Sequence, residues 1–246
     1  NWALRDEFPR SIRNEIAPGA LQQITNLIER YLLNPNHPDW AGQWARIYDR
    51  DGEARYAVSL IHASSNRLAP WDHDAYAQGF DLLADEVARQ TGVRIGFLID
   101  PLPQNSNAPG VFKPDPENTG PALMSTRSLL GIQAFLPEIW HPGTPTEGQL
   151  ITYKRESSRR WAATGIPFLM DVSPGYDARI VFPESIIYGF TPQWKTLLTE
   201  MARDYGQDGL SFHSWNGFTE GMAAVPSEEF GKLYYLWLMN LCQLND

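Results

Sequence analysis

Short apolar segments alternate with longer amphipathic ones along most of the chain. The short segments are rich in the branched and aromatic residues typical of β-strands. The candidate strands are Tyr56–Ala63, Val93–Asp100, Ile132–Trp140, Ile166–Ser173 and Gly209–Asn216. Because a crossover between parallel strands normally contains a helix, this alternation predicts about five βα units.

The segments between the candidate strands have apolar residues at helical spacing. We expect helices at Asp74–Thr91, Glu147–Thr164 and Gln193–Tyr205, with further helices at about Pro18–Leu33 and Glu228–Leu241. The first three end next to a glycine, which is a common helix stop. In the helix at Asp74–Thr91, the side chains of Phe80, Leu83 and Val87 should share the buried face.

Polar or aromatic residues stand where each candidate strand ends. They are His62, Asp100, Glu138, Trp140, His141, Asp171, Tyr176, Asp177, His213, Trp215, Asn216 and Glu220. Such strand ends are typical of a (β/α)8 barrel, whose active site lies at the carboxyl ends of its strands. No glycine-rich phosphate loop follows a strand, which disfavours the open dinucleotide-binding sheet. The long segment Pro101–Gly131 is interpreted as a lid or an insertion.

Composition narrows the class of protein. Acidic residues outnumber basic ones, 29 to 20, which gives a formal net charge of −9 and argues against nucleic-acid binding. The mean hydropathy is −0.37, and no apolar run approaches the ~20 residues that span a bilayer. The single cysteine, Cys242, cannot form an internal disulfide or a cysteine zinc site. Aromatic residues make up 12%, and their flat faces suit the apolar faces of sugars.

The segment Ser211–Pro226 reads SFHSWNGFTEGMAAVP. It resembles the last barrel strand of family 99 glycoside hydrolases, the endo-α-mannosidase type, and of the related family 71, whose motif reads roughly S-W-N-E-W-x-E-G-T-x-I-E-P. The segment Ser173–Asp177 (SPGYD) is similar to the one after the preceding strand in those families. Asn34–Trp40 (NPNHPDW) and Asn1–Asp6 (NWALRD) resemble two upstream motifs, in the same order.

The resemblance implies a (β/α)8 barrel or its C-terminal portion. If NWALRD follows the family's third strand, residues 1–246 form a single barrel domain that lacks its N-terminal strands. We therefore expect that an N-terminal segment is missing or that a second chain completes the barrel. The alternative is a short α/β domain of five units. A removed signal segment would favour an extracellular or periplasmic location, which the sequence leaves open.

The resemblance also implies the reaction, which is the endo-acting hydrolysis of a glycan or polysaccharide. Glycoside hydrolysis typically uses two carboxyl groups, whereas family 99 enzymes are understood to let the sugar's 2-hydroxyl attack, with one Glu as its base and another as acid. Glu220 matches the acid, whose pKa apolar neighbours would raise. Gly217 stands where the family has the other Glu, so the base must come from another strand end or the reaction must differ. The candidates for the base are Asp100, Glu138, Asp171 and Asp177, of which we favour Glu138. An ion pair between Glu138 and Arg127 is the structural alternative.

The remaining strand-end residues are candidates for substrate binding. They are Asn216, Trp215, His213, His62, Asp100, Trp140, His141, Asp171, Tyr176 and Asp177. The histidines lack the close-paired spacing of a metal site, so we expect neither metal nor cofactor. Asp177 is equally consistent with a salt bridge to Arg179. Two other functions stay open: a catalytically silent carbohydrate-binding or glycan-assembly domain, and a polysaccharide lyase that uses a His or Tyr base.

Overall fold

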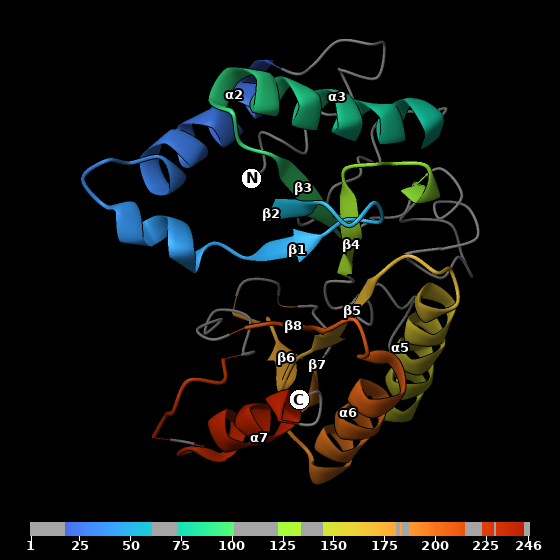
Figure 1. Ribbon diagram of the computed structural model, residues 1–246. Coiled ribbons are helices and arrows are strands. Elements are labelled where there is room, and N and C mark those ends of the chain that lie inside the picture. The colour runs from blue at the N-terminus through green and yellow to red at the C-terminus, as the bar shows by residue number, and fades with distance from the viewer. Residues whose placement is uncertain are drawn as a thin grey trace. The chain divides into compact units, whose positions relative to one another are not determined.

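The computed structural model describes residues 18–60, 73–100, 123–133, 145–180, 183, 187–214, 223–228 and 230–243 (Figure 1). The described residues form two compact units, the first ending at residue 132 and the second beginning at residue 133. Each unit combines parallel strands with helices, so the expected α/β class is confirmed.

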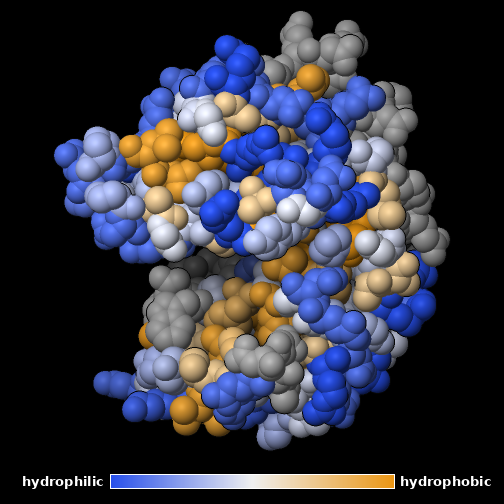
Figure 2. All heavy atoms as spheres, in the orientation of Figure 1, coloured by the Kyte–Doolittle hydropathy of each residue, from blue (hydrophilic) through white to orange (hydrophobic). Residues whose placement is uncertain are grey.

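The first unit begins with helical segments. Helix α2 (Pro18–Leu27) continues directly into the π-helical turn η2 (Ile28–Leu32), and together they occupy the range expected of one helix. The short 3₁₀ helix η3 (Pro38–Gln43) follows. Ala20, Ile24 and Ile28 are buried at helical spacing. Figure 2 shows a hydrophobic patch over this segment, where Leu27 and Leu33 are 44% and 47% exposed.

The sheet of the first unit has the strand order β1-β2-β3-β4. Strand β1 (Arg46–Tyr48) is antiparallel to β2 (Ala54–Leu60), whereas β2 is parallel to β3 (Ile95–Ile99) with Tyr56 opposite Ile95. Helix α3 (His73–Thr91) is the crossover between these two parallel strands. It buries Phe80, Leu83 and Val87, as expected from their spacing.

Strand β4 (Leu129–Gln133) is parallel to β3 and begins earlier than expected. The sequence pattern assigns Leu129, Leu130 and Gly131 to the end of the long segment Pro101–Gly131, because the prolines, asparagines and glycines of that segment are typical of a loop. The strand forms because both leucines are buried. A Cβ atom on Gly96 of β3 would lie 2.6 Å from Cγ of Leu130, so the missing side chain at Gly96 makes room for Leu130.

The second unit repeats the strand-helix alternation. It contains α5 (Glu147–Ala162), β5 (Phe168–Val172), α6 (Pro192–Tyr205) and β8 (Leu210–Phe212), and β5 is parallel to β8. A capping box between Thr146 and Gln149 starts α5, and Thr191 caps α6. These helices agree with the expected ranges to within two residues. The core of the unit includes Trp161, Met170, Trp194 and Met201, all fully buried.

Two strands and one helix of the second unit lie outside that alternation. Strands β6 (Gly175–Asp177) and β7 (Ile187–Gly189) form an antiparallel ribbon that the sequence analysis did not anticipate. Helix α7 (Leu233–Cys242) overlaps the expected C-terminal helix but begins five residues later and ends one residue later. It is apolar on most sides, and Figure 2 shows hydrophobic atoms at the surface near it. No helix in the described part of the chain is both long and apolar enough to cross a membrane.

Candidate active site

The carboxyl ends of β5 and β8 bring two of the expected site residues together. Asp171 is in the last part of β5, opposite Ser211 of β8. His213 follows β8, and its backbone N–H donates to the carbonyl oxygen of Val172 at 2.9 Å, which extends the pairing by one step. Because side chains alternate along a strand, Asp171, Ser211 and His213 all lie on one face of the strand pair.

The carboxylate of Asp171 has a partner on each side. Nζ of Lys154, which comes from the middle of α5, binds Oδ2 of Asp171. Nδ1 of His213 hydrogen-bonds to the other oxygen, Oδ1. The side chain of Lys154 is fully buried, that of Asp171 is 2% exposed, and that of His213 is 12% exposed. The three residues therefore form a network that reaches solvent at its histidine.

The electrostatics of this network keep Asp171 ionised. Burial alone would raise the pKa of the carboxyl group, because a low-dielectric surrounding penalises the charge. The charge of Lys154 and the hydrogen bond and charge of His213 oppose this effect and together outweigh it, so the pKa of Asp171 lies below its ordinary value. A buried lysine thus neutralises a buried aspartate at the strand end.

The arrangement fixes the ring of His213. An ionised Asp171 accepts from Nδ1, which selects the tautomer and sets the orientation of the imidazole. Nε2 then faces Oγ of Ser211 at 3.4 Å. Ser211 itself is buried, and a hydroxyl at this distance is a weak partner. The network therefore holds an oriented histidine at the point where the chain enters the segment Trp215–Glu220.

The other described candidates have structural partners. Asp100, directly after β3 in the first unit, is buried, and its N–H donates to the carbonyl oxygen of Leu60 at 2.9 Å. The ring of Tyr176 is buried and stacks on Tyr188 with ring centres 5.8 Å apart. Asp177 forms a two-pronged ion pair with Arg179, with contacts of 2.7 and 2.8 Å, which is the alternative considered from the sequence. The hydrogen bond from Arg179 lowers the pKa of Asp177.

Most of the expected catalytic and stacking residues lie outside the described residues. They are Glu220, Glu138, Asn216, Trp215, His62, Trp140 and His141. Their roles stay predictions. Arg127, the partner considered for Glu138, binds Asp85 at 2.9 Å and Asp81 at 3.4 Å. Within the described part of the chain, no group of three or more His, Cys, Asp or Glu side chains could hold a metal ion.

Lys154 is a site residue that the sequence reasoning missed. Its signal is its position on α5, because the buried residues of this helix include Leu150, Tyr153, Ser157 and Trp161 at spacings of three and four. A lysine on that stripe has to be buried with them. A buried ammonium group requires a carboxylate partner, and such an exception to the apolar pattern could have pointed to Asp171.

The fold resembles that of a known glycoside hydrolase. The GH99 endo-α-mannosidase from Bacteroides thetaiotaomicron aligns with 91% of this chain at 14% sequence identity and a TM-score of 0.53. The structure of such an enzyme in complex with bis-tris-propane gives the same identity, coverage of this chain and TM-score. The chain spans 63% of the first structure and 67% of the second. No family model and no curated protein sequence matches the chain.

At this identity the likeness shows the fold alone. The chain has the α/β architecture of part of a (β/α)8 barrel, as the sequence analysis expected. The described parallel strands β2, β3, β4, β5 and β8 correspond to the five candidate strands.

Proposed function

We propose that this chain carries the C-terminal part of the active site of an endo-acting glycoside hydrolase that cleaves a glycan. The observation that carries the proposal is the structural likeness to an endo-α-mannosidase over 91% of the chain. The sequence adds the segment Trp215–Glu220, which follows β8 and resembles the family motif. A barrel places such a segment at its catalytic face.

Each site residue has a role in this proposal. Glu220 donates a proton to the oxygen of the glycosidic bond as that bond breaks, and water then adds to the sugar carbon. Glu138 is the second carboxylate, in place of the glutamate that Gly217 has replaced. Asn216 and His213 position sugar hydroxyls, and Trp215 and Trp140 are the stacking candidates. The role proposed for His213 is supported by its contacts, because Asp171, itself bound to Lys154, holds the imidazole ring in one orientation.

The substitution Glu220→Gln tests the proposal. Activity is measured as reducing ends released from α-mannan and from a panel of other glycans. We expect turnover to fall by about 10²–10⁴-fold, the usual contribution of a general acid. Glu156→Gln is the control, because Glu156 is an exposed acid bound to Arg159 and Arg160 on α5. Unchanged turnover in Glu220→Gln would remove Glu220 from the mechanism.

A second candidate function is supported by Gly217. A glycine cannot act as a base, and a hydrolase that has lost its base but kept its aromatic residues becomes a carbohydrate-binding domain. Glycan binding without release of reducing ends from any substrate would favour this function over hydrolysis.

A further inference from the structure

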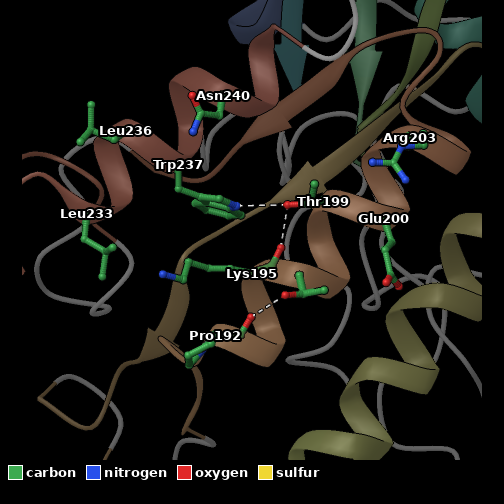
Figure 3. Close-up of a pocket in the computed structure, with 10 residues that line it drawn as sticks. Pro192, Lys195, Thr199, Glu200, Arg203, Leu233, Leu236, Trp237 and Asn240 are labelled. Carbon is green, nitrogen blue, oxygen red and sulfur yellow. Dashed lines mark hydrogen bonds between the residues drawn. The ribbon is translucent and has the colours of Figure 1, made fainter.

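An open groove of about 630 Å³ lies between α6 and α7 in the second unit (Figure 3). One wall is a stripe of α6 residues at helical spacing, and the other is a stripe of α7 residues at the same spacing. The lining residues are Pro192, Lys195, Thr196, Thr199, Glu200, Arg203, Leu233, Leu236, Trp237 and Asn240. The α6 wall is mainly polar and the α7 wall is mainly apolar, so the groove is amphipathic across its width.

The groove carries more positive than negative charge. The acidic residue among those that line the groove is Glu200. Its carboxylate is bound at 3.3 Å by Arg155 of α5, which does not itself line the groove. Lys195 rests its ammonium group over the ring of Tyr234 at 5.7 Å. Among the described residues, neither Lys195 nor Arg203 has an acidic side chain within ion-pair distance. This local excess contrasts with the formal net charge of −9 for the whole chain.

The apolar wall presents an oriented aromatic ring. The indole of Trp237 lies across the groove, and its Nε1 donates a long, weak hydrogen bond to Oγ1 of Thr199 at 3.4 Å (Figure 3). Leu233 and Leu236 beside it are 47% and 54% exposed. Thr199 lies midway between Lys195 and Arg203 along α6, and these two cations are about 12 Å apart along the helix axis at the usual rise per residue. Trp237 therefore stands between two positive charges.

We propose that this groove binds an acidic oligosaccharide segment. A pyranose ring has an apolar face of C–H groups and a polar rim, which matches one aromatic wall and one hydrogen-bonding wall. Trp237 contacts the face of a sugar ring, and Lys195 and Arg203 bind carboxylate groups on either side of it. Arginine favours such planar carboxylates. The groove holds the ligand and does not cleave it, so the assignment does not depend on the catalytic role of Glu220.

Titration calorimetry of the full chain with tetragalacturonate and with neutral mannotetraose tests the assignment. We expect tetragalacturonate to bind about tenfold more tightly than mannotetraose and to lose affinity as salt rises, because the discriminating contacts are ionic. Arg203→Gln should weaken tetragalacturonate binding by about two- to fivefold, the range of an exposed ion pair. Arg46→Gln is the matched control, since Arg46 is an exposed arginine over the ring of Tyr56 in the first unit.

The aromatic contact is tested separately. Trp237→Ala should weaken the binding of both sugars by about tenfold, and Trp237→Phe, which keeps a flat ring, should retain most of the affinity. Should Trp237→Ala fail to fold, as judged by circular dichroism, Arg203→Gln and Trp237→Phe still decide the question. Glu220→Gln should bind tetragalacturonate as the unaltered chain does, even if its turnover is lost.

Three results would overturn the assignment. The first is equal affinity for the two sugars, and the second is unchanged tetragalacturonate binding in Arg203→Gln. The third is a dimer in light scattering that Leu236→Gln abolishes, because a second copy of the chain would then occupy the groove.

Discussion

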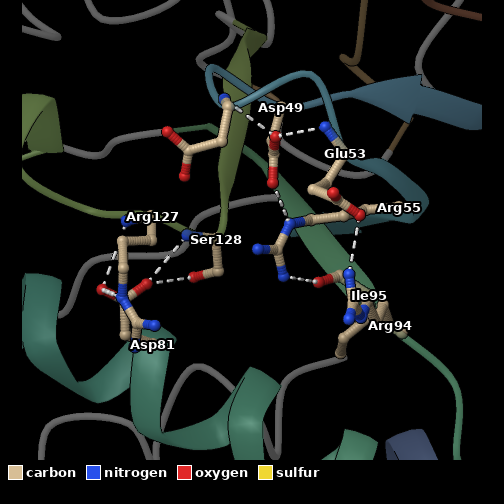
Figure 4. Close-up of polar contacts among 9 residues, drawn as sticks. Asp49, Glu53, Arg55, Asp81, Arg94, Ile95, Arg127 and Ser128 are labelled. Carbon is tan, nitrogen blue, oxygen red and sulfur yellow. Dashed lines mark hydrogen bonds and ion pairs between the residues drawn. The ribbon is translucent and has the colours of Figure 1, made fainter.

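The two units use the same pairing of aspartate with a cation in different ways. In the first unit, Asp49 accepts hydrogen bonds from the side chain of Arg55 and from the backbone N–H groups of Asp51 and Glu53, at 3.0 and 2.9 Å (Figure 4). These bonds close the turn between β1 and β2. In the second unit, Asp171 joins a helix to the ends of two strands through Lys154 and His213. The first arrangement fixes a turn, whereas the second also orients a histidine.

The rest of the polar network in the first unit is also structural. Asp81 of α3 accepts from the N–H and the hydroxyl of Ser128, both at 2.8 Å, and pairs with Arg127 (Figure 4). It thus ties the crossover helix to the residue before β4. The comparison teaches that residue type does not distinguish the two networks. Both aspartate side chains are almost fully buried, and the difference lies in the cation, because the side chain of Lys154 is fully buried whereas that of Arg55 is 16% exposed.

Breaking the buried pair should give the largest effect. Lys154→Met keeps the volume of the side chain but leaves Asp171 buried with His213 alone. We expect the free energy of unfolding to fall by about 3–5 kcal/mol, the usual cost of removing one partner of a buried ion pair. Urea denaturation followed by circular dichroism measures it. Arg155→Gln, at the next position of α5, is the control, and a loss below about 1 kcal/mol in Lys154→Met would contradict the role given to the pair.

The pH dependence sharpens the same comparison. The pKa of Asp171 is held below its ordinary value of 3.8, so its ionised form stabilises the folded chain above that pH. This stability is lost as the pH falls through the lower, folded-state pKa. The difference in unfolding free energy between the unaltered chain and Asp171→Asn should therefore shrink as the pH falls below about 4. A difference that stays constant down to pH 2 would show that the charge of Asp171 is not what stabilises the site.

The helices were the most predictable part of this fold. Apolar residues at helical spacing, such as Phe80, Leu83 and Val87 in α3, and the glycine at the end of each helix predicted the bounds of α3, α5 and α6 to within two residues. Strands β1, β6 and β7 have three residues each, which is too short for an alternating pattern to stand out. Strand β4 was placed late because Leu130 packs into the space that Gly96 of β3 leaves, and only the folded sheet supplies this neighbour.

The candidate site was predictable only in part. Asp171 and His213 were identified from their places at strand ends, and the structure joins them. Lys154 was missed because a lysine on the buried face of a helix points to a site only once its carboxylate partner on β5 is known. Tyr176 and Asp177 also stand at a strand end in the sequence, yet a tyrosine stack and an ion pair engage them. The sequence can indicate that a residue stands at a strand end, but it does not show which neighbouring side chain that residue contacts in the folded chain.

Breaking the turn network of the first unit should cost less than breaking the buried pair. Asp49→Ala leaves the N–H groups of Asp51 and Glu53 and the guanidinium of Arg55 without this acceptor. We expect a loss of about 1–3 kcal/mol in unfolding free energy, because the side chain of Arg55 is 16% exposed and water can replace part of its bonding. Asp49→Asn, which keeps one acceptor oxygen, should lose less. A cost for Asp49→Ala equal to that of Lys154→Met in the same urea experiment would remove the distinction between the two networks.

The smallest effect should come from exposed ion pairs, whichever unit they are in. In the first unit, Arg94 binds Glu53, and their side chains are 62% and 58% exposed. In the second unit, Arg155 binds Glu200, and their side chains are 50% and 53% exposed. Arg94→Gln and Arg155→Gln should each change the unfolding free energy by less than about 1 kcal/mol, because water and salt screen both pairs. If Arg155→Gln instead cost several times more than Arg94→Gln, the second unit would be sensitive to any lost charge, and the large effect expected for Lys154→Met would no longer single out the site at Asp171.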